Sequence, residues 1–242
     1  MIKRVTDTDS LSGVNSPLFP LICVDFKFPQ SESDGVFFQE IDDKKALVLS
    51  LKGDLLTCIK LSGEIDFDEL YAFISFWGVT NFLFDFQIEH LDLKKRVLME
   101  CEPIETSISD IKTLSSVSNL REYKSVFELI STENGDFDIW FPVFSKKINK
   151  GNALGVYAMV SDVSVSTSVA PYVYNDTAII AGVFTRGEYR NQGFASKCVK
   201  SLINECKARN VQKIYLWCED ENINFYKNSG FTVCGEVYTK EE

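Results

Sequence analysis

Histidine is nearly absent from this sequence, which holds only His90 among its 242 residues. Histidine-rich metal sites are therefore excluded, and a Ser-His-Asp triad is disfavoured because only one residue could serve as its base. The seven cysteines are odd in number, widely scattered and without a C-x-x-C pair. Most of them lie inside apolar runs, so we expect small buried hydrophobic side chains in a reducing compartment and no metal site.

Long apolar runs are also missing, since none approaches the roughly 20 residues that a membrane-spanning helix needs. The first residues, MIKRVTDTDSLSG, lack the apolar stretch of a secretory signal. Basic residues are in deficit, because 25 Lys and Arg face 35 Asp and Glu, which gives a net charge of −10. Such a surface repels nucleic acids and anionic membranes at long range. We therefore expect a cytoplasmic protein that binds neither nucleic acid nor a membrane, and the sequence carries no signal of oligomeric state.

Apolar residues, in contrast, are abundant enough for a sizeable core: 45% of the residues are hydrophobic and 13% are aromatic. The length suits two domains of about 100–150 residues each. The charged stretch QIEHLDLKKR marks a boundary between them. We predict an N-terminal α+β domain over residues 1–95 and a second domain over residues 96–242.

The N-terminal domain is predicted from three strand-like runs between about residues 37 and 61, with a hairpin turn at Lys52-Gly53-Asp54. A helix follows, for which Asp66 and Glu69 form a capping-box pattern and Gly78 is the C-terminal cap. The stretch VTNFLFDF then predicts a buried strand.

The second domain is predicted to follow the order β-α-α-β-β-β-α-β-α-β. In its first helix, NLREYKSVFELIST, helical spacing places Leu120, Tyr123 and Val126 along one side. The second helix, DFDIWFPVFSKKINKG, contains Pro142, which we expect to kink the helix or end a turn.

The stretch EYRNQGFAS, residues 188–196, joins the apolar run TAIIAGVFT to a helix with Cys198 and Leu202 on its apolar face. The first amides of a helix lack internal partners and carry the positive end of its dipole, so this turn can bind an anion. Gly193 lets the backbone approach a ligand, and Arg190 can add a charge-assisted contact to phosphate. An ordinary strand-to-helix turn would account for the same two residues. The motifs G-x-x-x-x-G-K-[ST] and G-x-G-x-x-G are both absent.

This stretch also resembles the acetyl-CoA signature of the GNAT N-acetyltransferase superfamily, [RQ]-x-x-G-x-[GA], with Arg190, Gly193 and Ala195 at its defining positions. A second stretch, NFYKNSGF at 224–231, is similar to the family's later motif, a tyrosine five residues before the phenylalanine of a closing Gly-Phe. The resemblance implies an α+β (mixed α/β) fold, with a GNAT-like acetyltransferase domain whose mixed, mainly antiparallel sheet is flanked by helices. The N-terminal strand-helix-strand order echoes the C-terminal one, so we interpret that domain as a degenerate GNAT-like lobe without a cofactor site.

The resemblance implies a chemistry as well. Acetyl-CoA would be the co-substrate, no metal would take part, and the acceptor would be a primary amine on a small molecule or a peptide. The end of the strand before the signature would offer backbone groups to the pantetheine arm, and the amides of the turn would hold the pyrophosphate. The implied cofactor-binding residues are Val183, Phe184, Thr185, Arg190, Asn191, Gln192, Gly193, Phe194, Ala195 and Ser196.

Tyr226 occupies the motif's tyrosine position, and the resemblance implies that it protonates the departing thiolate. A phenol with a pKa of about 10 can donate to a thiolate whose conjugate acid has a pKa of about 8.5. The other interpretation of Tyr226 is an aromatic that packs one face of a short helix. Phe225 and Phe231 are assigned to the core.

Two departures from the family pattern keep a second function open. Many members carry an asparagine seven residues before the tyrosine, and this chain has Glu219 at that position. Members also often carry a glutamate on the strand before the signature, and the corresponding stretch TAIIAGVFT has no carboxylate. The carboxylates nearest the expected cleft are Glu102, Asp176, Glu188 and Glu219. The alternative function is a catalytically degenerate module that binds acyl-CoA or a protein.

Overall fold

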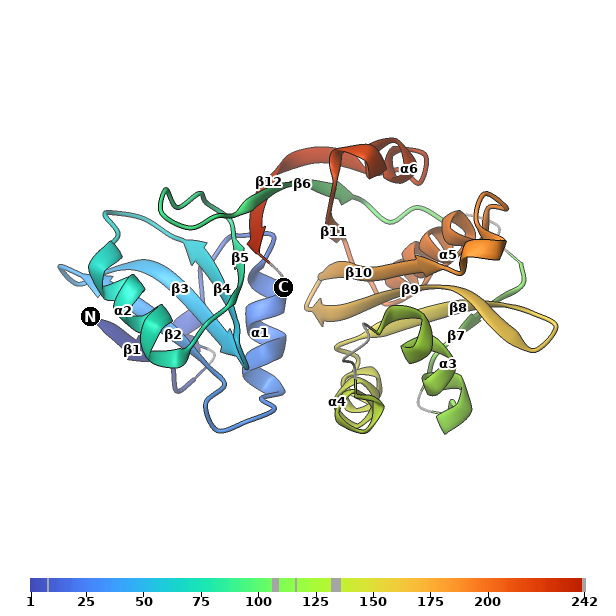
Figure 1. Cartoon of the computed structure of the whole chain (residues 1–242), viewed down its shortest axis with the longest axis horizontal. Coiled ribbons are helices and arrows are strands. Elements are labelled where there is room, and N and C mark those ends of the chain that lie inside the picture. Colours follow the sequence, from blue (N-terminus) through green and yellow to red (C-terminus); the bar gives the residue numbers. More distant parts are fainter. Residues whose placement is uncertain (8, 106–108, 116, 132–135, 241–242) are drawn as a thin grey trace. The chain divides into compact units, whose positions relative to one another are not determined.

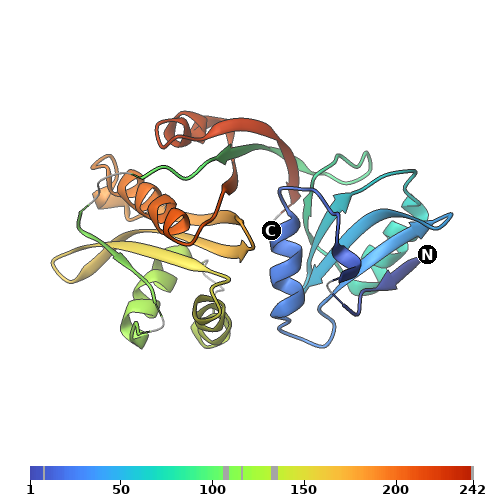
Figure 2. The same ribbon diagram turned by 180° about the vertical axis from the view of Figure 1, so that it is seen from behind.

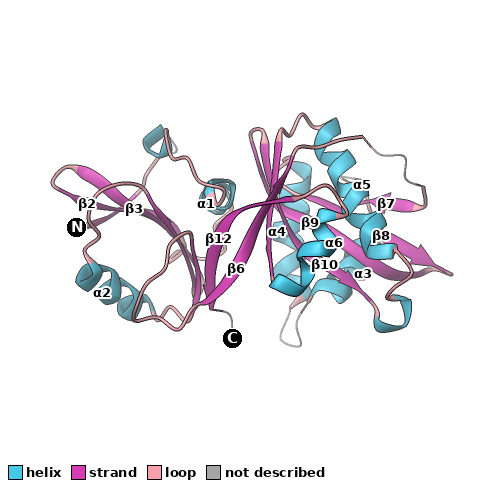
Figure 3. Ribbon diagram, turned by 90° about the horizontal axis from the view of Figure 1, so that it is seen from above, coloured by secondary structure: helices cyan, strands magenta, loops and turns pink. Residues whose placement is uncertain are grey.

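The structure is a computed structural model of the chain, and it describes residues 1–7, 9–105, 109–115, 117–131 and 136–240. It divides into two compact units. Unit 1 comprises Met1–Leu98, Trp217–Asp220 and Cys234–Glu242, and unit 2 comprises Met99–Leu216 and Glu221–Val233. Figure 3 shows that strands and helices occur in both units, and a boundary between residues 95 and 96 stays a prediction.

Unit 1 is a sheet with one helix on each face. Its elements are β1 (Ile2–Arg4), α1 (Phe19–Lys27), β2 (Gly35–Ile41), β3 (Lys44–Lys52), β4 (Leu55–Lys60), α2 (Phe67–Trp77), β5 (Asn81–Phe84), the first part of β6 (Lys94–Cys101) and most of β12 (Thr232–Lys240). The strand order is β1-β2-β3-β4-β5-β12, and β4 pairs with β5 in parallel while the flanking pairs are antiparallel. Helix α2 lies in front of this sheet in Figure 1 and α1 lies in front of it in the reverse view of Figure 2.

In unit 2, parallel and antiparallel strands form a mixed part of the sheet that is also covered on both faces. Its elements are β7 (Ile111–Thr113), α3 (Leu120–Ile130), α4 (Phe137–Asn149), β8 (Leu154–Val160), β9 (Val163–Tyr174), β10 (Thr177–Thr185), α5 (Phe194–Ala208), the first part of β11 (Lys213–Cys218) and α6 (Ile223–Lys227). The strand order is β11-β10-β9-β8-β7, with β10 and β11 parallel and the other pairs antiparallel. Helices α3 and α4 lie in front in Figure 1, and α5 lies in front in Figure 2. The predicted mixed, mainly antiparallel sheet flanked by helices is confirmed.

Local sequence signals explain where the helices begin and end. The Asp66 carboxylate accepts a hydrogen bond from the Glu69 amide at 2.9 Å, and Gly78 ends α2 with a left-handed φ of 62°. The predicted capping box is incomplete, however, because the Glu69 carboxylate accepts the amide of Ile2 at 2.5 Å instead of reaching back to Asp66. A complete capping box stands at the start of α3, between Asn119 and Glu122.

Three features differ from the sequence-based expectations. Helix α4 continues through Pro142 instead of ending there, because the proline lies in the second turn and removes a single amide donor. Leu120, expected on the buried side of α3, is 56% exposed, and Leu129 is buried in that helix. Helix α1 and the short strand β7 were not predicted.

The interiors of both units are apolar. Six of the seven cysteines are buried, and Cys234 is exposed. Among the described helices, none combines the length and the apolar character that a membrane span needs. The described residues also contain no group of three or more side chains placed to share a metal ion.

Candidate functional site

Strands β10 and β11 run in parallel but pair only where they begin. Thr177 pairs with Lys213, Ala178 with Ile214 and Ile179 with Tyr215. Beyond Ile179 no further pair joins these two strands, both of which are fully described. On its other side β10 stays paired with β9 as far as Thr185, with register shifts on either side of Ala181. Irregular pairing bends a strand, and the two parallel strands separate after Ile179.

Gly182 lies within the second register shift, between Ala181 and Phe184, and cannot be replaced without strain. Its φ is +72°, and a Cβ atom there would lie 2.8 Å from Cγ2 of Val169 and 3.3 Å from Cγ2 of Ile130. Side chains seldom adopt that φ, and the first distance is too short for carbon atoms in contact. Both conformation and space therefore require glycine at this bend.

The turn after β10 presents backbone donors. Tyr189 N donates to Arg186 O and Arg190 N donates to Gly187 O, while Lys197 N begins the helical pattern by donating to Gly193 O at 3.0 Å. Between them, no backbone N–H from residue 191 to residue 196 has an acceptor among the described residues. These are the amides that the sequence predicted at the start of α5.

The conformation of this turn explains its glycine. Asn191 and Gly193 have φ values of 60° and 83°, both left-handed, and Gly193 is the N-cap of α5 without any side-chain cap. A Cβ on Gly193 would meet no other atom within 4 Å, so the positive φ rather than crowding within the protein favours glycine. Successive amides in such a turn form a concave anion-binding surface, which the helix dipole reinforces.

A hollow of about 560 Å³ opens beside these amides. It is lined by Val183, Phe184, Thr185, Tyr189, Arg190, Asn191, Gly193, Phe194, Ala195, Ser196, Asn222, Phe225 and Tyr226. All of the predicted cofactor-binding residues are therefore brought together, except that Gln192 is not part of the lining. The Gln192 side chain folds back instead, and its Nε2 donates to Glu188 O at 3.0 Å.

Tyr226 borders the same hollow from α6. Its ring also contacts the core, because its centroid lies 5.9 Å from that of Phe231, which is 1% exposed. Phe231 is thus a core residue as expected. Phe225 is not: it is half-buried and lines the hollow beside Tyr226. A five-residue helix without a single buried residue leaves its aromatic side chains at the surface of the hollow.

Tyr189 and Asn222 are the other lining residues that sequence reasoning missed. Tyr189 packs edge-on against Phe194, with ring centroids 6.1 Å apart. Its position in the short 3₁₀ turn Gly187–Tyr189, directly before the signature, was the available signal.

Among the residues that the structure describes, Arg190 is the one charged side chain that lines the hollow. Its Nε donates to Thr185 O at 3.2 Å, which fixes the guanidinium beside the end of β10. The four carboxylates considered from the sequence lie elsewhere: Glu102 pairs with Lys213, Glu219 pairs with Arg96, Asp176 accepts from Thr177, and Glu188 is exposed. A hollow with one positive charge and a row of amides, in a chain of net charge −10, suits an anionic ligand.

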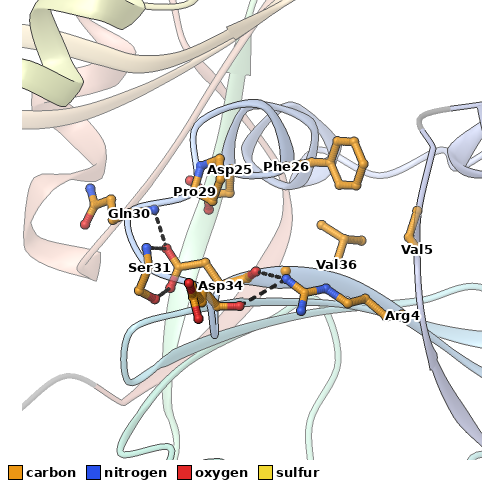
Figure 4. Close-up of a pocket in the computed structure, with 11 residues that line it drawn as sticks. Arg4, Val5, Asp25, Phe26, Pro29, Gln30, Ser31, Asp34 and Val36 are labelled. Atoms are coloured by element: carbon orange, nitrogen blue, oxygen red, sulfur yellow. Dashed lines mark hydrogen bonds between the residues drawn. The ribbon is translucent and has the colours of Figure 1, made fainter.

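Unit 1 contains another hollow, of about 520 Å³, between the end of α1 and the start of β2 (Figure 4). Three of its charged side chains have partners in the protein. The Asp34 carboxylate accepts from the amides of Gln30, Ser31 and Gly53, and Arg4 donates to Asp34 O. Asp25, which also borders it, pairs with Lys52 at 3.1 Å. Because the hollow in unit 2 is the one beside the row of amides, we assign the functional site to unit 2.

Comparison with known proteins agrees with this site. The profile described as the acetyltransferase (GNAT) family matches residues 126–231, which include the separated strands, the turn and Tyr226. The C-terminal part of this chain is a GNAT acetyltransferase domain. Acyl transfer from acetyl-CoA is the chemistry of that family. No curated protein sequence matches the chain.

Solved structures extend the likeness to the whole chain. A GCN5-related N-acetyltransferase from Sphaerobacter thermophilus shares 13% identity at a TM-score of 0.61, over 100% of this chain and 95% of its own. A GCN5-related N-acetyltransferase from Kribbella flavida shares 12% identity at a TM-score of 0.62, over 94% and 95%. A tandem GNAT protein from the clavulanic acid biosynthesis pathway shares 11% identity at a TM-score of 0.62, over 96% and 91%. At such identities the likeness concerns the fold, and it includes the unit that precedes the GNAT domain.

Proposed function

We propose that this protein transfers an acetyl group from acetyl-CoA to a primary amine of a small molecule or a peptide. One observation carries the proposal: the amides of residues 191–196 have no acceptor among the described residues, and five of these six residues line a hollow that also contains Arg190 and Tyr226. A diphosphate is the part of acetyl-CoA that such amides and a guanidinium bind. Val183, Phe184 and Thr185 lie on the part of β10 that no longer pairs with β11, and they are the residues that would contact the pantetheine arm.

The reaction requires few groups from the protein. The amine attacks the thioester carbonyl, the carbon–sulfur bond breaks, and the thiolate takes up a proton. Tyr226 is the residue that we assign to this proton transfer, because it lines the hollow, occupies the tyrosine position of the motif and carries an acidic hydroxyl.

One observation favours a second function. Catalysis also needs a group that removes a proton from the attacking amine, and no carboxylate or histidine lines the hollow in the part of the chain that the structure describes. A module that binds acyl-CoA without turning it over would have the same lining. The two functions share the cofactor site and differ only in turnover.

Isothermal titration of the protein with acetyl-CoA tests the shared part. We expect saturable binding, and we expect Arg190→Ala to weaken it about tenfold, the value of one charge-assisted hydrogen bond. Arg209→Ala is the matched control, since it removes the same charge just beyond the other end of α5. A wild-type protein that does not bind acetyl-CoA would overturn both functions.

A thiol-release assay then separates the two functions. The protein and acetyl-CoA are incubated with polyamines, aminoglycosides and peptides that have free amines, and free coenzyme A is measured against time. Amine-dependent release supports the transferase. Binding of acetyl-CoA without release on any amine supports the binding module.

A further inference from the structure

Strand β9 carries an unusual row of buried hydroxyls. It lies between β8 and β10 in the sheet, and Ser164, Ser166 and Ser168 are 4%, 0% and 0% exposed. Alternation along the strand places Ser166 and Ser168 on one face, and a register shift against β8 lies between Ser164 and Ser166. A strand buried within a sheet usually carries apolar residues, and a buried hydroxyl is costly unless it is hydrogen-bonded. The row therefore needs an explanation.

Ser166 differs from its two neighbours in having partners. Its Oγ donates to Phe184 O at 2.9 Å and lies 2.8 Å from Oγ1 of Thr185, which can donate to it in turn. Among the described residues, the hydroxyls of Ser164 and Ser168 have no hydrogen-bond partner. The row thus has one bonded member, and its bonds go to the end of β10.

That strand end is also the wall of the acyl-CoA hollow. Phe184 and Thr185 line the hollow, and beyond the second register shift their backbone pairs with Thr167 and Ser166 of β9. Ser166 adds to this backbone pairing, because its side chain holds one carbonyl and one hydroxyl of the same segment.

Further hydrogen bonds hold the residues that follow β10, up to Arg190 in the signature turn. Arg186 N donates to Val165 O at 2.9 Å, and Arg186 Nε donates to Ser164 O at 2.8 Å. Arg190 Nε donates to Thr185 O. Ser166 also interacts with the thiol of Cys198 in α5. Burial raises the pKa of that thiol to about 11, and the hydrogen bond with Ser166 acts in the opposite direction.

We infer that Ser166 is a positioning residue of the acyl-CoA site, which holds the end of β10 and the start of α5 in the arrangement that receives the cofactor. The inference rests on the proposed binding of acetyl-CoA. It assigns to Ser166 no contact with the cofactor.

The test compares Ser166→Ala with Ser168→Ala in the full chain. Both changes remove one fully buried hydroxyl from the same face of the same strand. Ser166→Ala should raise the Kd for acetyl-CoA about fivefold to tenfold, the effect of losing about one hydrogen bond. It should raise the KM for acetyl-CoA equally and leave the KM for the amine acceptor unchanged. Ser168→Ala should keep the Kd within about twofold of wild type, since its hydroxyl has no partner to lose.

A purely structural role predicts a different result. If Ser166→Ala lowers the melting temperature but leaves the Kd for acetyl-CoA equal to that of Ser168→Ala, the inference is overturned. Should Ser166→Ala fail to fold, Thr185→Val removes the other hydroxyl of the pair and keeps the shape of the Thr185 side chain. An unchanged Kd for acetyl-CoA in this variant would overturn the inference, and an increased Kd would support it. Failure of the wild type to bind acetyl-CoA is a separate result, which overturns the proposed function itself.

Discussion

The chain contains two parallel strand-helix-strand crossovers, β4-α2-β5 in unit 1 and β10-α5-β11 in unit 2, and the two helices begin in opposite ways. At the start of α2 the Asp66 carboxylate caps the first turn, and Asp68 and Glu69 add further negative charge. At the start of α5, Gly193 is the cap, no acidic residue stands in the first turn, and the amides have no acceptor. An anion is therefore repelled at the first helix and attracted at the second.

The strand pairs differ just as clearly. Strands β4 and β5 pair along the whole of β5, from Leu55–Asn81 to Cys58–Phe84. The Asp85 carboxylate then accepts the amide of Lys60 at 2.8 Å and extends the connection beyond the last pair. Strands β10 and β11 separate after three pairs. The strand-helix-strand order therefore does not by itself create an anion-binding site. The two strands must also separate, and the helix must begin without a side-chain cap.

The largest expected effect tests whether turnover belongs to unit 2 alone. Tyr226→Phe should lower kcat about 100-fold to 1,000-fold, because it removes a general acid, and should leave the KM for acetyl-CoA nearly unchanged. Tyr71→Phe, which removes a hydroxyl from α2 in unit 1, is the control and should leave kcat at the wild-type value. A kcat for Tyr226→Phe within threefold of wild type would leave Tyr226 as a packing residue.

The next change gives α5 the cap that α2 has. Gly193→Asp should weaken acetyl-CoA binding about 100-fold, because the new carboxylate competes for the free amides and repels the diphosphate. Titration calorimetry measures this effect, and wild type should bind one acetyl-CoA per chain. Gly78→Asp places the same side chain at a similar positive φ, 62°, in unit 1. That control should lose stability to a similar degree and keep the wild-type affinity; equal affinity losses in both variants would refute the explanation.

The reverse change removes the cap from α2. Asp66→Ala should lower the free energy of unfolding by about 1 kcal/mol, the usual value of an N-cap, with Asp68→Ala as a control that removes a charge without a cap. Thermal unfolding should show the difference as a lower melting temperature for Asp66→Ala. Titration should still give one acetyl-CoA per chain, because β4 and β5 remain paired. A second bound acetyl-CoA would show that the Asp66 cap alone prevents acetyl-CoA from binding to unit 1.

The sequence predicted the amide-bearing turn because its physical causes are local. A glycine, an arginine and the start of an amphipathic helix are all readable from neighbouring residues. The roles of Tyr189, Asn222 and Phe225 were not readable, since they depend on which side of α6 and of the 3₁₀ turn borders the hollow.

Competition between partners explains the remaining errors. The Glu69 side chain fits the capping box by spacing, but the amide of Ile2, distant in sequence, takes its carboxylate. Pro142 would break a helix interior, but near the start of α4 it removes one bond from a helix whose other contacts remain. The anchoring by Ser166 is invisible to sequence reasoning as well, because it joins residues 18 and 19 positions apart across two strands.

The smallest expected effect concerns the contact that extends the β4–β5 connection. Burial raises the pKa of the Asp85 carboxyl, although hydrogen bonds from the Lys60 amide and the Ser16 hydroxyl partly offset the rise. The folded protein therefore holds this proton more tightly than the unfolded chain does. The contribution of Asp85 to the free energy of unfolding is thus greatest below the ordinary pKa of aspartate and declines as the pH rises through the raised value.

Asp85→Asn should abolish this decline, because the amide oxygen can still accept from Lys60 and the amide nitrogen can bond to Ser16 without a charge. Urea unfolding at a series of pH values measures the difference between variant and wild type, so that the other carboxylates cancel. The variant should gain stability relative to wild type as the pH rises from about 3 to 7, a range that begins near the ordinary pKa of aspartate. The control is Asp92→Asn at an exposed position, which should differ from wild type by the same amount at every pH. A variant that instead loses stability relative to wild type with rising pH would show that the charge of Asp85 itself holds β4 to β5. The crossovers β4-α2-β5 and β10-α5-β11 would then differ in electrostatics rather than in hydrogen-bond geometry.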